Sequence, residues 1–349
     1  MRNLSTSNSD HVSIDSEAAA IAAKSCEPIP YLTASKAVWL RWVLFLAMIS
    51  SVTALPVYII DPYNLVRSGP QVVSPNIKRE YAQSIDDPLW KLPLYDRNPA
   101  ENILLGDSQM EHLTAEEISS VTGGKRYFNL AYGGGTLRES ISTFWHAAAR
   151  GRLRSVYFGV NFMAYNSSPS DRAAAADKIR EHPLRYFYDS GVLQTSVYDA
   201  LALIPGARMN SGPGMARDLF WQWQLDFLTN RYKNVAHKNV ASPAILEDEL
   251  VKIQEYARRN DIHLVFVITP QHVDAQYRVN DLGLAAEYAR FKRYFTSLGS
   301  TLDCDIPSKI TEDRRNYSDP FHLTDEAAKR IVEDIWTETF RWCHQLPTE

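Results

Sequence analysis

The longest uncharged hydrophobic segment of the chain lies near its N-terminus, between Arg41 and Asp61. Its 19 residues read WVLFLAMISSVTALPVYII. As a helix they would span about 28 Å, close to the hydrocarbon thickness of a bilayer. A buried core helix is the alternative, but no other segment is so long and free of charge. The pattern therefore predicts a membrane-spanning anchor over residues 36–60, with Pro56 near its end.

The charges beside this segment indicate its orientation. Lys36 and Arg41 precede it and Asp61 follows it. Because basic residues tend to stay on the cytoplasmic side, we expect residues 1–41 in the cytoplasm and residues 61–349 outside it. A cleaved signal peptide fits less well, since the apolar run starts late and no clear small-x-small site follows it.

Two segments around the anchor have a composition that disfavours regular structure. Residues 1–35 are polar, small and rich in serine, and we expect a disordered cytoplasmic tail. Residues 61–100 hold six of the 18 prolines of the chain, including that of the sequence DPYN at 61–64. Proline interrupts helices and sheets, so this part is expected to be an irregular juxtamembrane stalk lying against the domain that follows.

From residue 101 to 344, short apolar runs alternate with segments of helical pattern. The sequence predicts buried strands over residues 102–106, 126–131, 155–160, 263–268 and, more weakly, 301–304. Helices are expected to begin at the capping residues Thr114, Thr136 and Thr324, the last one continuing to about Trp342. Residues 171–260 form a long, mainly helical insertion. This alternation predicts a parallel sheet wrapped by helices, with a ligand site beyond the carboxyl ends of the strands.

Composition narrows the class of protein. The chain has 349 residues, is 45% hydrophobic and 22% charged, and has a formal charge of −4. It is therefore globular, and it lacks the basic excess of a general nucleic-acid binder. Its eight Trp, 18 Tyr and 13 Phe are expected mainly in the core, the alternative being a ring-stacking surface for a flat ligand such as a sugar.

Cysteine and histidine positions offer no metal site. Cys26, Cys304 and Cys343 are too few and too scattered for a disulfide framework or a cysteine-based zinc site, and no cluster has metal-ligand spacing. Outside the cytoplasm, Cys304 and Cys343 can form a disulfide, but two unpaired buried thiols are equally compatible with the sequence.

Ser108 is the first candidate for chemistry. It stands in Gly106-Asp107-Ser108-Gln109, directly after the first expected strand. A strand-to-helix turn exposes a side chain at the sheet edge, and the following helix offers N–H groups to an oxyanion. The alternative is that Ser108 only caps that helix.

A glycine-rich segment and an asparagine follow the next two strands. Residues 129–136 read NLAYGGGT, whose glycines allow the backbone to approach a ligand. They do not have the G-x-G-x-x-G spacing of a dinucleotide-binding loop. Asn161 ends the third strand, where its amide can donate to a developing oxyanion. Both segments also suit ordinary turns.

Asp319 and His322 precede the last helix in the sequence DPFH. The imidazole can act as a general base, and the carboxylate three residues earlier can orient it. Taken alone, the pair also fits an exposed polar surface.

In chain order, these motifs (G-D-S, N-x-x-x-x-G-x-T, G-x-N and D-x-x-H) resemble those of the SGNH, or GDSL-type, hydrolase superfamily over roughly residues 101–344. The resemblance implies a flavodoxin-like three-layer α/β/α sandwich with a parallel sheet and no cofactor. It implies that Ser108 is the nucleophile and that His322 and Asp319 are the base and its orienter. Gly134 and Asn161 would be oxyanion donors beside the Ser108 amide.

The chain departs from the usual motifs of this superfamily. Gln109 stands where Leu is common, Phe162 where Asp is usual and Ala327 where Gly is often found, which indicates a divergent branch. With its anchor and its DPYN sequence, the chain is similar to membrane-anchored SGNH-like proteins of bacterial envelopes. Some of these O-acylate exported polysaccharides. This similarity implies an inner-membrane location with the C-terminal domain in the periplasm.

Further residues are candidates for contact with a substrate. Gln109, Tyr165 and His272 are predicted to line the acceptor pocket, although a loop histidine without a role is the simpler interpretation of His272. His112 follows Ser108 by four residues and is within reach of it, but as a base it would be redundant with His322.

The sequence therefore predicts serine-dependent acyl-ester chemistry on an envelope or exported polysaccharide. Water as acceptor would give an esterase. A sugar hydroxyl would give an O-acyltransferase, which needs an acyl donor passed on by a separate membrane protein. The alternative is a non-catalytic SGNH-like protein that binds a glycan or assembles a polysaccharide secretion machine.

Overall fold

The computed structural model describes residues 36–66, 72–165, 168, 170–204, 216–236 and 244–347. The chain divides into two compact units, Met1–Val52 and Thr53–Glu349. The predicted disordered tail, residues 1–35, lies outside the described residues.

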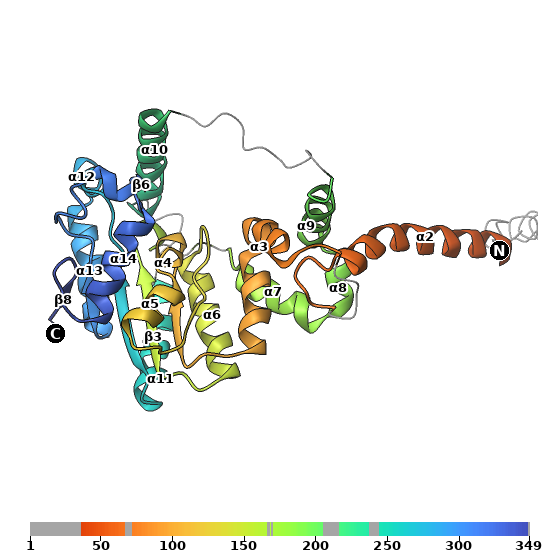
Figure 1. Ribbon diagram of the computed structural model, residues 1–349, viewed down its shortest axis with the longest axis horizontal. Helices are drawn as coiled ribbons and strands as arrows, with labels where there is room; N and C mark the ends of the chain where they lie inside the picture. The colour runs from red at the N-terminus through yellow and green to blue at the C-terminus, as the bar shows by residue number, and fades with distance from the viewer. Residues whose placement is uncertain are drawn as a thin grey trace, which may run out of the picture. The chain divides into compact units, whose positions relative to one another are not determined.

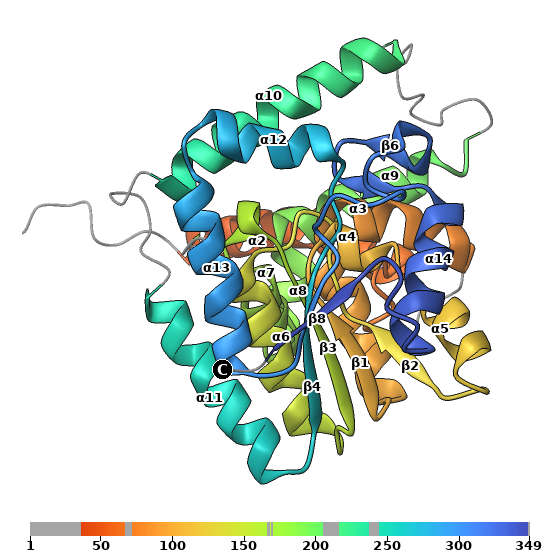
Figure 2. The ribbon, with the colours of Figure 1, turned by 90° about the vertical axis from the view of Figure 1, so that its left-hand side faces the viewer.

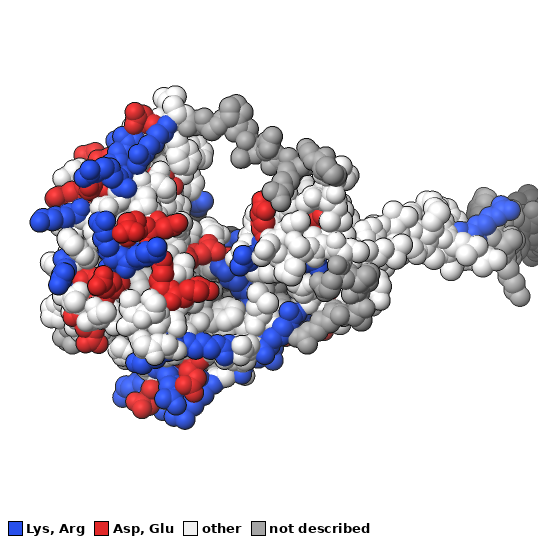
Figure 3. Space-filling view, in the orientation of Figure 1, with Lys and Arg blue, Asp and Glu red and all other residues white. Residues whose placement is uncertain are grey.

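A single continuous helix, α2 (Lys36–Ile60), covers the apolar segment. Within the described residues, its part Val38–Ile60 is the one helix long and apolar enough to cross a membrane. Many of its large side chains, such as Trp39, Trp42 and Leu46, are exposed. Figure 3 shows almost no charged side chains along most of α2, whereas both signs of charge are interspersed over the part that holds the sheet. The predicted helix is confirmed, and its orientation stays a prediction.

The larger unit is built on a six-stranded sheet of order β2-β1-β3-β4-β5-β8, seen in Figure 2. All neighbouring strands are parallel except β5 and β8, which are antiparallel. The order 2-1-3-4-5 is that of flavodoxin-like sheets, so the predicted α/β class is confirmed. The strands are β1 (Asn102–Leu105), β2 (Tyr127–Asn129), β3 (Ser155–Val160), β4 (His263–Ile268), β5 (Thr301–Asp303) and β8 (His344–Leu346).

Helices cover both faces of the sheet (Figures 1 and 2). On one face α5 (Ala115–Val121) packs against α14 (Asp325–Trp336). On the other, α11 (Ala244–Arg259) packs between α6 (Leu137–Arg150) and α13 (Ala285–Leu298). The central strands β1, β3 and β4 are mostly apolar and buried, as parallel strands covered on both faces must be.

The predicted helix caps are present. Thr114 and Thr324 each accept a hydrogen bond from a backbone N–H group three residues later. Thr136 and Glu139 form a complete capping box at the start of α6. These caps satisfy N–H groups that would otherwise have no partner at the helix ends.

The segment 61–100 is not an irregular stalk, which corrects the sequence prediction. Most of it is the helix α3 (Pro75–Arg97), much of which is buried. Pro75 lies in its first turn, where a missing N–H costs nothing. Asp86 interrupts the helical geometry and accepts from the Leu89 N–H at 3.1 Å, so that Pro88 again stands at the start of a helical segment. Pro75 and Pro88 therefore begin helical segments, and Pro93 lies within the second one without ending it.

The described residues of the insertion form five helices, and two of them pack against α3. These two are α7 (Arg172–Glu181) and α9 (Ser190–Leu201). The others are α8 (Pro183–Tyr188), α10 (Arg217–Ala236) and α11. The DPYN sequence is tied to this region, because the Asp61 carboxylate accepts from the Tyr186 hydroxyl at 2.7 Å and the buried Lys78 donates to the Asp61 carbonyl at 3.0 Å.

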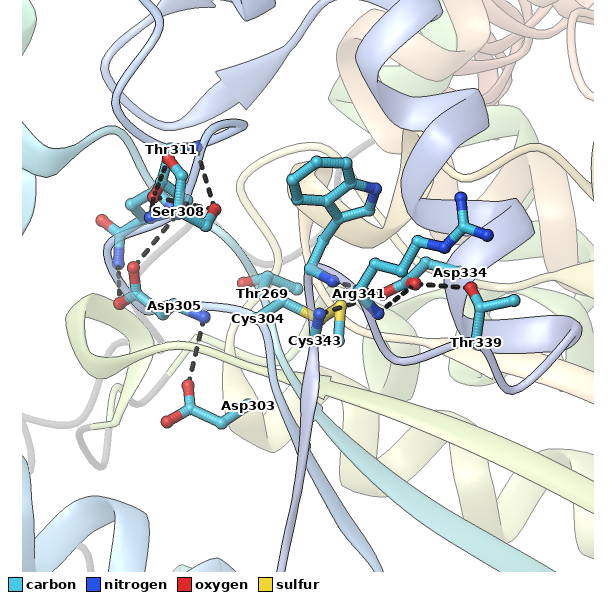
Figure 4. Close-up of a disulfide and its surroundings, with 12 residues drawn as sticks. Thr269, Asp303, Cys304, Asp305, Ser308, Thr311, Asp334, Thr339, Arg341 and Cys343 are labelled. Atoms are coloured by element: carbon cyan, nitrogen blue, oxygen red, sulfur yellow. Dashed lines mark hydrogen bonds between the residues drawn. A yellow bond between two sulfur atoms is a disulfide. The ribbon is translucent and has the colours of Figure 1, made fainter.

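A disulfide joins Cys304 to Cys343 (Figure 4) and decides between the two alternatives left by the sequence. It links the end of β5 to the segment before β8. The last helix ends at Trp336, earlier than predicted, because the Asp334 carboxylate accepts from the N–H groups of residues 341–343 and turns the chain back towards the sheet.

Candidate active site

Ser108 and Asn161 lie at the carboxyl ends of β1 and β3, where the strand order of the sheet reverses. A crevice for ligands opens at this point in doubly wound sheets. Ser108 is the first residue of the short helix α4 (Ser108–Glu111), and Asn161 follows β3 directly. The two motifs thus meet at one edge.

Two glycines make room for Met110 beneath this turn. A Cβ atom on Gly106 would lie 2.7 Å from the Met110 Cγ, and one on Gly159 would lie 1.9 Å from it. Gly106 also has a φ of +145°, which favours glycine. The glycines of both motifs are therefore required by packing, and they fix the turn that carries Ser108.

Ser108, His322 and Asp319 form a continuous hydrogen-bonded chain. The Ser108 Oγ lies 2.7 Å from the His322 Nε2, and the His322 Nδ1 lies 2.7 Å from the Asp319 Oδ2. The other carboxylate oxygen of Asp319 accepts from the backbone N–H groups of Phe321 and His322, both at 3.0 Å. With both oxygens occupied, the carboxylate is fixed and in turn fixes the imidazole.

A small hairpin explains why D-x-x-H brings its two side chains together. Its strands are β6 (Tyr317–Asp319) and β7 (His322–Leu323), in which Asp319 pairs directly with His322. The two side chains are therefore cross-strand neighbours. Gln224 of α10 adds a fourth polar contact to Asp319, at 3.5 Å from its Oδ2.

The orientation of the Asn161 amide is fixed at both ends. Its Oδ1 accepts from the Ala164 N–H at 2.8 Å, and its Nδ2 donates to the Asp107 Oδ2 at 2.6 Å. An amide nitrogen carries two hydrogens, so one remains for another acceptor. Burial raises the pKa of Asp107, and hydrogen bonds from the Gln109 N–H and from Asn161 oppose this shift.

The glycine segment, residues 129–136, lies beside Ser108. Gly134 has a φ of +63°, is exposed and lines a cavity that Ser108 and His322 also line. Its neighbour Gly133 is held through its carbonyl oxygen, which accepts from Arg172 at 2.9 Å. Arg172 also pairs with the buried Glu139 of the capping box at 2.8 Å. The loop is thus anchored to α6 and α7.

Lys91 of α3 is bonded to the helix that begins with Ser108. Its ammonium group lies 2.8 Å from Asp87 and 2.7 Å from Glu111, and donates to the Ala131 carbonyl at 2.5 Å. Glu111 belongs to α4, which begins with Ser108. One buried cation therefore connects α3, the nucleophile helix and the end of β2.

A cavity of about 280 Å³ opens beside Ser108 and His322. The sequence prediction missed its α10 side, which consists of Trp223, Gln224, Phe227 and Arg231. Trp223, Phe227 and Arg231 are spaced by four residues, so they share one helix face. That spacing is visible in the sequence, but the approach of α10 to Ser108 is not.

The three predicted pocket residues do not line this cavity. Gln109 is buried, and its Oε1 accepts a hydrogen bond from the Thr269 hydroxyl. Tyr165 is buried among aromatic rings, and its hydroxyl donates to Glu247. His272 is buried against Trp221, at 4.9 Å between ring centroids. Their placement corrects the prediction that they contact a substrate in the cavity.

The ring of His112 lies beside that of the base, and its backbone N–H donates to the Ser108 carbonyl at 3.3 Å. Its ring centroid lies 5.4 Å from that of His322. Burial and, secondly, the neighbouring His322 lower its pKa. In the part of the chain that the structure describes, no group of three or more His, Cys, Asp or Glu side chains is arranged to hold a metal ion.

The chain is similar to several solved structures, but no known family could be assigned to it. No family model and no curated protein matches the chain. Among the similar structures is the crystal structure of a "putative acylhydrolase" from Bacteroides fragilis, with a TM-score of 0.35 and 15% sequence identity. The match covers 74% of this chain and 97% of that chain.

Proposed function

We propose that the protein cleaves acyl esters through a serine nucleophile. The observation that carries this proposal is the hydrogen-bonded chain from Ser108 through His322 to Asp319, with 2.7 Å at each step between side chains. This is the arrangement in which an imidazole can remove a proton from a hydroxyl group as the oxygen attacks a carbonyl.

In this mechanism, the Ser108 Oγ attacks the ester carbonyl and the His322 Nε2 takes its proton. Asp319 holds the Nδ1–H of the resulting imidazolium. The oxyanion is stabilised by the N–H of Ser108, the N–H of Gly134 and the second hydrogen of the Asn161 amide. The protonated His322 then protonates the leaving alcohol, and an acyl-enzyme remains on Ser108.

The acyl group next passes to water or to a sugar hydroxyl, activated in turn by His322. We propose an O-acyl group on an envelope or exported polysaccharide as the substrate, in line with the SGNH-like motifs and the anchor. A protein of this kind acts outside the cytoplasm, at a bacterial inner membrane. The apolar helix α2 and the Cys304–Cys343 disulfide support this location, because disulfides persist in oxidising compartments.

The test is hydrolysis of 4-nitrophenyl acetate by the full-length protein in detergent micelles. Ser108→Ala should lower kcat at least about 10³-fold, while the far-ultraviolet circular dichroism spectrum stays unchanged. Ser140→Ala is a matched control, because Ser140 is a buried serine of α6 that bonds only to its own helix among the described residues. Activity of Ser108→Ala equal to that of the wild type would contradict the proposal by placing the nucleophile elsewhere. A wild-type protein without activity would contradict it too and favour a non-catalytic glycan-binding protein.

A further inference from the structure

Helix α10 is apolar on two faces, and packing explains only one of them. Trp221, Leu225, Leu228 and Tyr232 are buried, and α10 packs there against α12 (Val273–Asp281). On another face, Trp223 is 54% exposed. A large exposed aromatic side chain at the edge of a cavity commonly marks a binding site.

The rings on this second face form an aromatic row. Phe220 and Trp223 lie 5.9 Å apart between centroids, Trp223 and Phe227 6.5 Å, and Phe227 and Phe321 6.3 Å. Successive ring planes differ by only 26°, 26° and 30°. The rings are therefore nearly parallel to one another. The Arg231 guanidinium lies 5.0 Å from the centroid of Phe227 and Phe321 is almost fully buried, so Trp223 is the most exposed ring of the row.

The aromatic row ends at the reacting groups. Phe321 precedes His322 in the chain, and their ring centroids lie 4.4 Å apart. Trp223, Phe227 and Phe321 line the same cavity as Ser108. A ligand that lies along the row would thus bring one end to the nucleophile.

The chemistry of the row favours sugar rings over an alkyl chain. A pyranose has apolar C–H faces and a polar rim, and the row combines flat aromatic faces with the polar side chains of Gln224 and Arg231 in the same lining. A long alkyl chain would require an enclosed apolar channel, whereas Trp223 is largely open to solvent. The centroid spacing is also comparable to the length of one pyranose ring.

We propose that the aromatic row Phe220, Trp223, Phe227 and Phe321 binds the sugar rings of a glycan, with the ring that carries the ester nearest to His322. This inference rests on the proposed function for the position of the ester, but glycan binding itself does not require catalysis.

Binding is tested on an array of neutral and uronic-acid-containing oligosaccharides, with the full-length Ser108→Ala protein in detergent micelles. The expected result is binding of at least one oligosaccharide, lost on adding Trp223→Ala and kept on adding Tyr277→Ala. Tyr277 is an aromatic residue of α12 that is 55% exposed and does not belong to the row. Absence of binding to any oligosaccharide, or binding that survives Trp223→Ala, would overturn the inference.

Kinetics then separates this inference from the proposed function. For an O-acetylated form of the bound oligosaccharide, Trp223→Ala should lower kcat/KM relative to that for 4-nitrophenyl acetate by about tenfold, or ~1.4 kcal/mol. Trp223→Phe should recover most of this ratio. If Trp223→Ala instead lowered kcat/KM for 4-nitrophenyl octanoate relative to that for the acetate, the row would bind acyl chains, and the inference would be overturned. Glycan binding without turnover of any ester would leave the inference standing and contradict only the proposed function.

Discussion

Replacing Lys91 by Met should destabilise the protein in a pH-dependent way. Lys91 is the buried cation between Asp87 and Glu111. Burial raises the pKa of Asp87 to about 6; Lys91 lowers it, and Glu111 raises it. Without Lys91, the pKa of Asp87 in the folded protein must rise further, because the main opposing interaction is gone.

The size of the effect follows from this shift. Below about pH 6, Asp87 is protonated in both folded proteins, so Lys91→Met costs only its hydrogen bonds, about 1 kcal/mol each. Above pH 6, the wild-type carboxyl ionises while the variant must keep its proton, at about 1.4 kcal/mol per pH unit. The loss of stability should therefore grow by about 3 kcal/mol between pH 6 and pH 8.

The assay is urea denaturation of the full-length protein in detergent micelles, followed by circular dichroism at pH 5 and pH 8. The double variant Lys91→Met/Asp87→Asn should recover most of the pH-dependent part, because no buried charge is left unpaired. Lys252→Met is the control: Lys252 forms an exposed ion pair with Glu249, and its loss should leave the urea midpoint unchanged.

An equal loss at both pH values would refute the reasoning, since it would mean that Asp87 does not titrate with the predicted coupling. The absence of any loss would show that Lys91 does not link α3 to the nucleophile helix in the folded protein.

Three further predictions concern other parts of the molecule. Asn161→Ala should lower kcat for 4-nitrophenyl acetate by about 10²–10³-fold through loss of one oxyanion donor, and an unchanged kcat would exclude this role. Burial raises the pKa of Asp199 to about 7, and Lys78 opposes this shift. The folded protein therefore loses stability as the pH rises towards 7, and above pH 7 the full cost of the buried charge is present. Asp199→Asn should accordingly stabilise the protein against urea by about 1–3 kcal/mol at pH 8 and hardly at pH 4; equal effects at both would contradict this. Cys304→Ser should cost about 4 kcal/mol, because the bridge closes a loop of 39 residues, and a reducing agent should destabilise the wild type but not the variant.

Much of the fold could be predicted because its signals are local. The parallel strands β1, β3 and β4 are short, mainly apolar runs, and each cap is a threonine followed by a fitting residue, as at Thr136 and Glu139. The meeting of Ser108 with Asn161 also followed from the pattern, since ends of parallel strands share one edge. The pairing of Ser108 with His322 was implied only by the resemblance to SGNH motifs, because His322 lies in the β6-β7 hairpin outside the parallel sheet.

The failures concern features that depend on position in three dimensions. The proline count of residues 61–100 indicated irregular structure, but Pro75 and Pro88 each stand where a helical segment begins. Gln109 does lie beside Ser108, yet its side chain turns inward to Thr269. A position at the sheet edge predicts proximity to a site and does not determine the direction of a side chain.

Two further elements were missed because their partners are distant in sequence. The strand β8 is short and mainly exposed, and it depends on the Cys304–Cys343 bridge and on Asp334. The contribution of α10 to the cavity depends on a contact between the insertion and the hairpin that carries His322. Neither contact leaves a local pattern.

The central claim is that Ser108 is an activated nucleophile, and labelling by a fluorophosphonate tests it most directly. The full-length protein in detergent micelles should react covalently, with the label on the peptide that contains Ser108 by mass spectrometry. Ser108→Ala should remove the label, and His322→Ala should slow labelling strongly. A wild-type protein that stays unlabelled, or a label that persists on another residue in Ser108→Ala, would contradict the account.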